Sequence, residues 1–257
     1  MTTSFGDYSS YYNLLYSDKE YDVEVSYIQS LLKKHAVGPI ASLLEMGCGT
    51  GIHAGHLAAS GIEVLGFDLS EKMLAYASEH AHRNGIYEPM LTFAHGDART
   101  FRTSKRFDVV TSLFHVFSYQ ASDADQRAML QTAGAHLVPG GLFIFDFWYG
   151  PAVLWQRPAT RVKYLEDSSL RVTRVAEPVI RDRENIVDVN YRVFVTDCES
   201  ERINEISEVH TMRFVFLPEI SKLLAENGFE LIEAEEWISG RAPSTDTWGV
   251  CVIARKC

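Results

Sequence analysis

The sequence lacks the features that would point to a membrane, an extracellular compartment or a nucleic-acid partner. No apolar run reaches the roughly 18 residues of a membrane-spanning helix, and the N-terminal stretch shows no basic and then apolar leader pattern. The formal net charge is −10, which argues against general affinity for nucleic-acid phosphates. The 4 cysteines follow neither a disulfide nor a metal-site spacing. We therefore expect a protein of the reducing cytoplasm.

A chain of 257 residues is long enough for one domain with a large core. Apolar runs alternate with helical patterns along the first half of the chain, which predicts a parallel, doubly wound sheet. The expected strands are 42–46, 62–67, 90–95, 107–113 and 142–147. Beyond Gly150-Pro151 the apolar residues alternate with a period of two, which predicts antiparallel strands, with two of them near 168–180 and 186–197. A helix starting at Pro218 and strands at 229–237 and 247–254 complete the pattern.

The expected fold is therefore α/β: a Rossmann-like, doubly wound, seven-stranded and mostly parallel sheet with an inserted antiparallel β-sheet. Residues 1–40 are an aromatic segment and a helix that cover part of the site, and residues 41–150 are the ligand-binding α/β core. Residues 151–216 are the antiparallel insertion, expected to cover the molecule on which the site acts and to provide a dimer contact. Residues 217–257 complete the core.

A glycine-rich turn, Gly47-Cys48-Gly49-Thr50-Gly51, follows the first expected strand and precedes a helix. Glycines let a ligand approach the backbone closely, and the helix N-terminus offers unpaired N–H groups. The dinucleotide fingerprint requires a small residue where this chain has Ile52, and no Gly-Lys-Ser/Thr of a Walker loop follows. Glu45, just before the turn, would repel a pyrophosphate. The turn therefore favours a cationic ligand.

Asp68 ends the second expected strand, and Gly96-Asp97-Ala98 ends the third. Parallel strands bring these residues to the same edge of the sheet as the glycine turn, where ligands bind in open α/β folds. A carboxylate at Asp68 can accept both hydroxyls of a ribose. The alternative is that Asp68 caps the following helix, although Ser70 offers a competing cap.

Histidines mark two further places. His115 and Tyr119 follow the fourth expected strand and are candidates to orient or deprotonate an acceptor, since a histidine pKa of about 6.5 suits that role. The alternative is that they line the pocket without a chemical role. His53 and His56 lie one helical turn apart, but no third and fourth ligand is spaced for a metal, so none is expected.

The sequence Glu45-Met46-Gly47-Cys48-Gly49-Thr50-Gly51 resembles the first motif of class I S-adenosylmethionine (SAM) dependent methyltransferases. The resemblance implies SAM as methyl donor and S-adenosylhomocysteine as product, with the glycine turn beside the cationic methionine moiety. It also implies that Asp97 accepts the adenine amino group and that the Ala98 N–H meets a ring nitrogen. Leu69 and Met73 can supply apolar faces for the adenine, although a methionine such as Met73 is by itself more often a core residue. The implied SAM-binding residues are Glu45, Gly47, Cys48, Gly49, Gly51, Asp68, Leu69, Met73, Asp97, Ala98 and Phe114.

Within that class, the chain is similar to sugar N-methyltransferases that dimethylate nucleotide-linked amino sugars, such as those of desosamine and mycaminose biosynthesis. The matching stretches are Tyr12–Tyr16, Leu113–Tyr119, Asp146-Phe147-Trp148, the inserted sheet and Ser239-Gly240-Arg241. The resemblance implies that Tyr119 lies beside the amine and that Arg241 meets the diphosphate. The candidate acceptor-binding residues are Tyr12, Tyr16, Trp148, His210 and Arg241.

Three functions remain open on sequence grounds. The first is methylation of the amino group of a nucleotide-linked amino sugar. The second keeps the fold but methylates a hydroxyl of a sugar or another small metabolite. The third is a SAM-binding regulatory protein without turnover, because methyl transfer requires no fixed catalytic side chain. The expected partner is a small molecule in each enzymatic case, with neither nucleic acid nor membrane, and a homodimer is expected through the inserted sheet.

Overall fold

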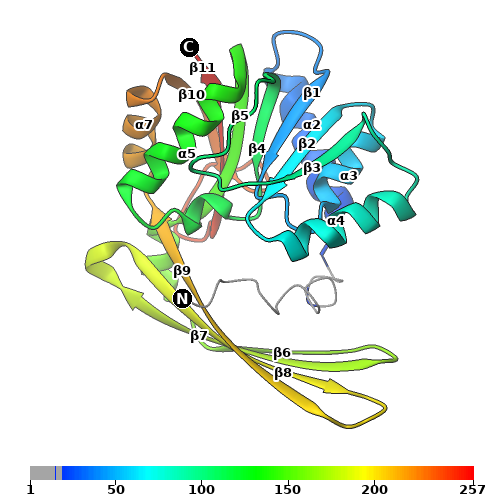
Figure 1. Ribbon diagram of the computed structural model, residues 1–257. Helices are drawn as coiled ribbons and strands as arrows, with labels where there is room; N and C mark the ends of the chain where they lie inside the picture. Colours follow the sequence, from blue (N-terminus) through cyan, green and yellow to red (C-terminus); the bar gives the residue numbers. More distant parts are fainter. Residues whose placement is uncertain (1–14, 16–18) are drawn as a thin grey trace.

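The structure is a computed structural model that describes Leu15 and residues 19–257. Its core sheet has the strand order β3-β2-β1-β4-β5-β11-β10. These strands are β1 (Ser42–Met46), β2 (Glu63–Asp68), β3 (Leu91–His95), β4 (Phe107–Ser112), β5 (Leu137–Tyr149), β10 (Phe229–Glu236) and β11 (Gly249–Lys256). Among the described core strands, β11 alone runs in the opposite direction to the others, antiparallel to both β5 and β10 (Figure 1). The mostly parallel α/β fold is thereby confirmed.

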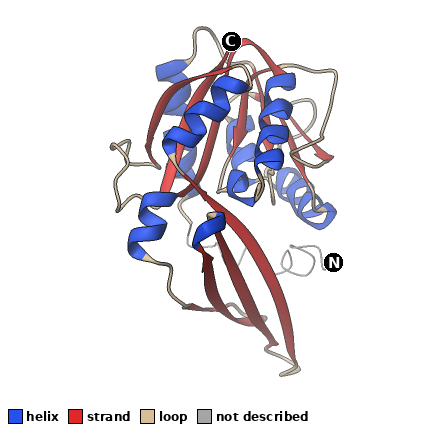
Figure 2. Ribbon diagram, turned by 90° about the vertical axis from the view of Figure 1, so that its left-hand side faces the viewer, coloured by secondary structure: helices blue, strands red, loops and turns tan. Residues whose placement is uncertain are grey.

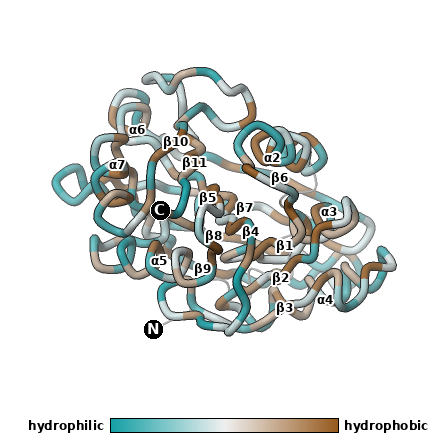
Figure 3. Tube along the Cα trace, turned by 90° about the horizontal axis from the view of Figure 1, so that it is seen from above, coloured by the Kyte–Doolittle hydropathy of each residue, from teal (hydrophilic) through white to brown (hydrophobic). Residues whose placement is uncertain are grey.

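Helices cover both faces of this sheet, which explains why its strands are apolar at successive positions. The helices are α2 (Tyr21–His35), α3 (Ile52–Ala59), α4 (Glu71–Arg83), α5 (Asp123–His136) and α7 (Leu217–Glu226). Leu43 and Ile144 pack with α2 and α3, whereas their neighbours Leu44 and Phe145 pack with α5 and α7. Seen from above, hydrophobic residues gather toward the middle and hydrophilic ones toward the outside (Figure 3).

The inserted sheet is an antiparallel meander below the carboxyl ends of the core strands (Figures 1 and 2). Its strands are β6 (Arg161–Glu166), β7 (Leu170–Arg181), β8 (Ile186–Asp197) and β9 (Ile203–Val215). β7 and β8 occupy the two expected ranges, with the short helix η2 (Asp182–Glu184) between them. The sheet joins the core where β9 lies parallel to β5, at the pairs Trp148–Phe214 and Tyr149–Val215.

Two local features differ from the sequence expectation. The short helix α6 (Gly150–Gln156) is absent from that expectation, because a run of 7 residues is too short to show helical periodicity. β5 begins at Leu137, although Pro139-Gly140-Gly141 indicates a turn before a strand at Leu142. The physical reason is an irregular register: Leu137 pairs with Phe107, and pairing resumes only at Leu142 with Val109.

Gly51 is a position where the turn tolerates no side chain. Its φ is +71°, and a Cβ there would lie 2.7 Å from the Phe93 ring and 2.9 Å from the Ala77 methyl group. We expect Gly51→Ala to lower the free energy of unfolding of the ligand-free protein by about 2–5 kcal/mol, from left-handed strain plus overpacking. Urea denaturation measures this loss.

Gly49→Ala is the matched control, because Gly49 has a φ of +54° but no atom within 4 Å of the position that a methyl group would take. Only the backbone strain of about 1–2 kcal/mol is expected there. Equal losses in the two variants would contradict the close packing of Gly51 against Phe93 and Ala77.

Candidate functional site

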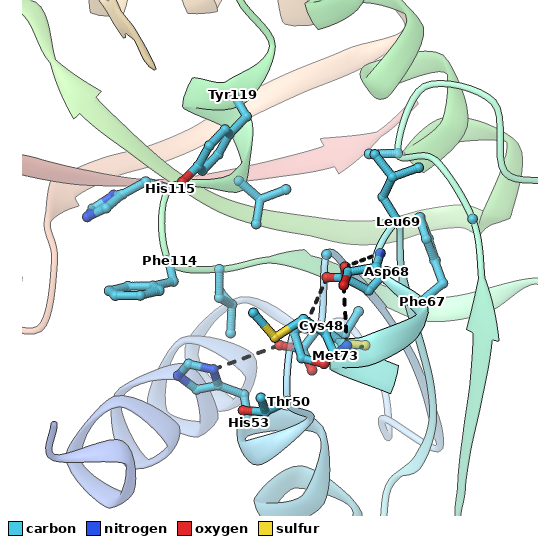
Figure 4. A pocket seen from close by; sticks show the side chains of 18 of the residues that line it. Cys48, Thr50, His53, Phe67, Asp68, Leu69, Met73, Phe114, His115 and Tyr119 are labelled. Atoms are coloured by element: carbon cyan, nitrogen blue, oxygen red, sulfur yellow. Dashed lines mark hydrogen bonds and ion pairs between the residues drawn. The ribbon is translucent and has the colours of Figure 1, made fainter. Parts of the chain in front are cut away.

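A cavity of about 710 Å³ opens at the carboxyl ends of β1 to β4 and reaches the inserted sheet. Most candidate residues line it: Glu45, Gly47, Cys48, Gly49, Asp68, Leu69, Met73, Asp97, Ala98, Phe114, His115, Tyr119, Trp148 and His210. Gly51 and Arg241 do not line it, and Tyr12 and Tyr16 lie outside the described residues. Figure 4 shows Cys48, Asp68 and Met73 on one side of the cavity and Phe114, His115 and Tyr119 on the other.

Asp68 ties the glycine turn to the following helix. Its Oδ2 accepts a hydrogen bond from the Gly49 N–H at 2.9 Å, and its Oδ1 accepts one from the Ser70 N–H at 2.8 Å (Figure 4). Ser70, not Asp68, caps α4, since its hydroxyl accepts from the Met73 N–H. Burial raises the pKa of Asp68, against the opposing effect of these backbone donors. Each carboxylate oxygen keeps lone pairs for further donors from a ligand.

Glu45 is a buried carboxylate at the floor of the cavity, 2% exposed. In the described part of the chain its Oε2 has no hydrogen-bond partner. Burial raises the pKa of Glu45 to about 8, although nearby Lys19 acts in the opposite direction. An unpartnered buried carboxylate oxygen is costly and is stabilised by a positive charge placed beside it. The floor of the cavity is therefore suited to a cationic ligand group.

Asp97 is held from one side by an arginine. Its carboxylate accepts from the Arg99 guanidinium, with an Nη2–Oδ2 distance of 2.6 Å, and Arg99 also donates to Asp125 of α5 at 2.9 Å. The hydrogen bonds from Arg99 lower the pKa of Asp97. Arg99 thus keeps Asp97 ionised and fixes its orientation at the rim of the cavity, where it can accept from an amino group of a ligand.

Leu69 and Met73 differ in their surroundings although both line the cavity. The Leu69 side chain is 63% exposed, so it can cover a flat ligand from the solvent side. Met73 is 2% exposed and packs with Leu15 and with Val172 and Val193 of the inserted sheet. α4 therefore links the cavity wall to the insertion.

Phe114 and His115 adopt consecutive left-handed conformations, with φ values of +65° and +64°. Each such residue costs about 1–3 kcal/mol, and such strain is concentrated at functional sites. Asp146, which is 1% exposed, holds this turn: its oxygens accept the His115 N–H at 3.0 and 3.1 Å. The His115 Nδ1 also lies 2.6 Å from the Asp146 Oδ2. A buried carboxylate therefore holds the His115 backbone and lies directly beside its ring.

The wall opposite the glycine turn combines the short helix η1 (Val116–Tyr119) with the inner face of the inserted sheet. The Tyr119 hydroxyl lies 2.7 Å from the His210 Nδ1, and the His210 Nε2 lies 3.0 Å from a Glu208 carboxylate oxygen. The Tyr191 ring meets the His210 ring edge to face at 4.8 Å between centroids. The structure thus brings two candidate residues, 91 positions apart, into direct contact.

Sequence reasoning missed Lys19, Arg99 and Tyr191 in the cavity lining. Lys19 pairs with Glu24 at 2.8 Å and lies over the Phe114 ring at 3.7 Å, while burial lowers the pKa of Lys19. Lys19 and Arg99 carry no sequence signal, because an isolated charge beside a helix or turn is usually solvated. Tyr191 does carry a sequence signal, the period-two pattern. With Val189 and Val193 it lies on the face of β8 that packs toward the core.

The described residues provide neither a metal centre nor a membrane-spanning helix. Among them, no group of three or more His, Cys, Asp or Glu side chains is arranged to hold a metal ion. Within the same part of the chain, each helix is too short or too polar to span a bilayer.

Comparison with known proteins agrees with this geometry. Residues 43–141 match the family model of a methyltransferase domain. The chain is 32% identical over 190 residues to dTDP-3-amino-3,6-dideoxy-alpha-D-glucopyranose N,N-dimethyltransferase of Streptomyces fradiae, covering 73% of this chain and 71% of that relative. It is 26% identical to dTDP-3-amino-3,4,6-trideoxy-alpha-D-glucopyranose N,N-dimethyltransferase of Streptomyces venezuelae, covering 91% and 95%.

A solved structure also aligns with the whole chain. It is the SAM-bound amino pentose methyltransferase of calicheamicin biosynthesis from Micromonospora echinaspora, with 26% identity, a TM-score of 0.74 and coverage of 100% and 99%. Fold, site and relatives together define a transferase of the Rossmann-like α/β class. The chain belongs to the class I SAM-dependent methyltransferases. Its methyl donor is SAM, and the alternative of a regulatory protein without turnover is thereby set aside.

Proposed function

We propose that this methyltransferase acts on the amino group of a nucleotide-linked amino sugar. The observation that carries the proposal is one cavity bounded by the glycine turn on one side and by Tyr119 and His210 on the other. The two relatives named above act, by their names, on dTDP-linked amino sugars. Their identities of 32% and 26% support the same class of acceptor.

The proposed donor arrangement follows the edge of the sheet. Glu45 and the glycine turn face the cationic methionine moiety, and Asp68 accepts the ribose hydroxyls. Asp97, steadied by Arg99, accepts the adenine amino group, while the Ala98 N–H donates to the ring. The Leu69 side chain covers the base, with Met73 below it and Phe114 beside the methionine chain. Support comes from the cavity lining and from the further lone pairs on these carboxylates.

The chain contributes alignment more than bond chemistry. A sulfonium methyl group is already activated, so the protein must hold the amine nitrogen about 3–3.5 Å from it and in line with the sulfur, which can supply roughly 7–11 kcal/mol of the barrier. The amine must also lose a proton before it can attack. Trp148, whose ring meets that of His115 at 6.2 Å, helps to exclude water on the acceptor side.

The test is turnover with defined acceptors and isotope-labelled SAM. The purified enzyme is offered dTDP-3-amino-3,6-dideoxyglucose and the matching 3-hydroxy sugar nucleotide, and products are scored by mass for one or two added methyl groups. We expect methylation of the amine and none of the hydroxyl. Methylation of the hydroxyl alone would reject the proposal.

One observation favours O-methylation as the second candidate. A hydroxyl nucleophile needs a general base, and His115 lines the cavity with its Nδ1 2.6 Å from the buried carboxylate of Asp146. On that alternative His115 takes the hydroxyl proton. His115→Gln would then abolish methyl transfer, whereas an amine acceptor would still be methylated.

Arg241 is proposed to bind the acceptor diphosphate, although it lies outside the cavity lining and is paired with Glu236 at 2.6 Å. Its side chain is 73% exposed, so it is available to a ligand that extends out of the cavity. We expect Arg241→Ala to raise the acceptor KM about threefold to tenfold at low salt, with less effect at high salt because exposed charges are screened. An unchanged KM would remove Arg241 from the acceptor site.

The outer face of the inserted sheet is proposed as a homodimer contact. It exposes large apolar side chains that a monomer would leave in water: Val162, Tyr164, Val179, Ile203 and Val209. The inner face of residues 151–216, with the helix of residues 1–40, would then cover the acceptor. Light scattering that gives a monomer mass of 29.0 kDa would reject the dimer.

A further inference from the structure

We infer that Glu208, His210 and Tyr119 form a hydrogen-bonded chain that fixes the polarity of the Tyr119 hydroxyl and carries the proton of the acceptor amine out of the cavity. The inference rests on the proposed function and adds a route for the proton. Tyr119 would be the catalytic residue, because it faces the acceptor. His210 and Glu208, which act through it, would be positioning residues.

The chain is continuous and comes from two elements far apart in sequence. The Tyr119 oxygen is 2.7 Å from the His210 Nδ1, and the His210 Nε2 is 3.0 Å from the Glu208 Oε2. The side chains of His210 and Glu208 are 3% and 9% exposed. Such burial strengthens hydrogen bonds and keeps water from replacing a member of the chain.

The direction of each hydrogen bond in the chain follows from Glu208, the carboxylate at the end farthest from the cavity. An ionised carboxylate only accepts, so Glu208 assigns the imidazole proton to the His210 Nε2. The His210 Nδ1 is then an acceptor, and the Tyr119 hydroxyl donates to it. With its proton committed to His210, the Tyr119 oxygen meets a ligand in the cavity as an acceptor, and the N–H groups of an amine are donors. The geometry therefore selects an acceptor substrate that donates hydrogen bonds.

The same order allows a proton to leave. An ammonium N–H bond breaks and its proton passes to the Tyr119 oxygen, while the Tyr119 proton passes to the His210 Nδ1. The electron pair left on nitrogen forms the N–C bond as the methyl carbon separates from sulfur, which keeps the pair of the broken bond. His210 is left as an imidazolium beside the Glu208 carboxylate, which stabilises its charge. It returns the proton to solvent after the products leave.

Titratable and charged groups approach His210 from η1 and from three strands of the inserted sheet. Tyr119, Glu208 and Tyr191 contact its ring, and the Arg174 guanidinium lies over the Tyr191 ring at 5.2 Å. Arg174 disfavours the imidazolium and Glu208 favours it. Glu208 is the closer of these two charges and is hydrogen-bonded to the ring.

A double-mutant cycle tests the chain. Tyr119→Phe, Glu208→Gln and the double variant are compared in kcat and KM with dTDP-3-amino-3,6-dideoxyglucose. We expect each single variant to lose about tenfold in kcat, because water can still take the proton, and the double variant to lose no more than one of them. Independent structural effects would multiply to about a hundredfold, which would overturn the inference. Glu205→Gln, an exposed change on the same strand, controls for loss of charge.

The pH profile separates this role from a packing defect. In the wild type, kcat should fall on the acid side only where the chain from Tyr119 to Glu208 can no longer take the proton of the amine. In both single variants this limb should move toward the pKa of the free acceptor amine. The inference would be overturned if the variants had a lower maximal kcat but the same acid-side pH dependence as the wild type. Matching SAM affinity and thermal midpoints show that the variants compared are folded and bind the donor. If only a hydroxyl acceptor turns over, the proposed function fails, and the same cycle on that acceptor still decides whether the chain acts as a unit.

Discussion

Asp68→Ala is expected to weaken SAM binding about 10- to 150-fold, equivalent to roughly 1.5–3 kcal/mol for hydrogen bonds to a charged group. The carboxylate already accepts from the Gly49 and Ser70 N–H groups, so its remaining lone pairs are fixed in direction before a ribose arrives. The substitution removes these acceptors and leaves the Gly49 N–H without its partner. Isothermal titration calorimetry with SAM measures the loss directly.

Two further variants make this result specific. Asp68→Asn keeps one acceptor oxygen and should fall between the wild type and the alanine variant. Asp246→Asn is the control for charge, because Asp246 is exposed in the segment before β11. An affinity for SAM that is unchanged in Asp68→Ala would remove Asp68 from the ribose site.

SAM binding is expected to tighten as the pH rises toward 8, by as much as tenfold for each pH unit, and to release close to one proton near neutral pH. The cause is Glu45, whose pKa burial raises to about 8 in the ligand-free protein. A cationic methionine moiety favours the ionised carboxylate, so binding must expel the proton. Calorimetry in buffers with different heats of protonation counts the protons released.

The same carboxyl group affects stability in the opposite direction. The pKa of Glu45 rises from its ordinary value of 4.5 to about 8 on folding, so between these values the folded protein holds a proton that the unfolded chain has lost. The free energy of unfolding of the ligand-free protein therefore falls as the pH rises through this range. Glu45→Gln should remove both the proton release and this slope. Full proton release in Glu45→Gln would show that another group titrates.

Much of the fold could be predicted because its strands are buried on both faces. Continuous apolar runs such as that at Leu142–Phe147 occur where helices cover both sides, and period-two alternation around Val189 to Val195 marks the one-sided insertion. α6 and the start of β5 could not be predicted in this way. Both depend on local pairing and packing around Gly140 and Pro151 that no periodicity records.

The donor side and the opposite wall of the cavity also differ in how far the sequence predicts them. Glu45, Asp68 and Asp97 lie at or just beyond the carboxyl ends of β1, β2 and β3, and parallel pairing alone brings these ends together. The contact of Tyr119 with His210 depends on how the insertion folds back over the core, which spacing along the chain does not reveal. Lys19 and Arg99 are harder still, since long charged side chains find their partners only in the tertiary structure.

The narrow junction between β5 and β9 has an evolutionary consequence. The inserted sheet pairs with the core through Trp148–Phe214 and Tyr149–Val215, whereas the residues proposed for the methyl donor belong to the first half of the chain. Substitutions at Tyr191 and His210 can therefore change the wall opposite the glycine turn, whereas substitutions at Val172 or Val193 would also reach Met73 of α4. One contiguous stretch of the gene thus encodes part of the proposed acceptor side, and hybrid enzymes cut after Tyr149 and rejoined at Phe216 would show how far that stretch alone sets the choice of acceptor.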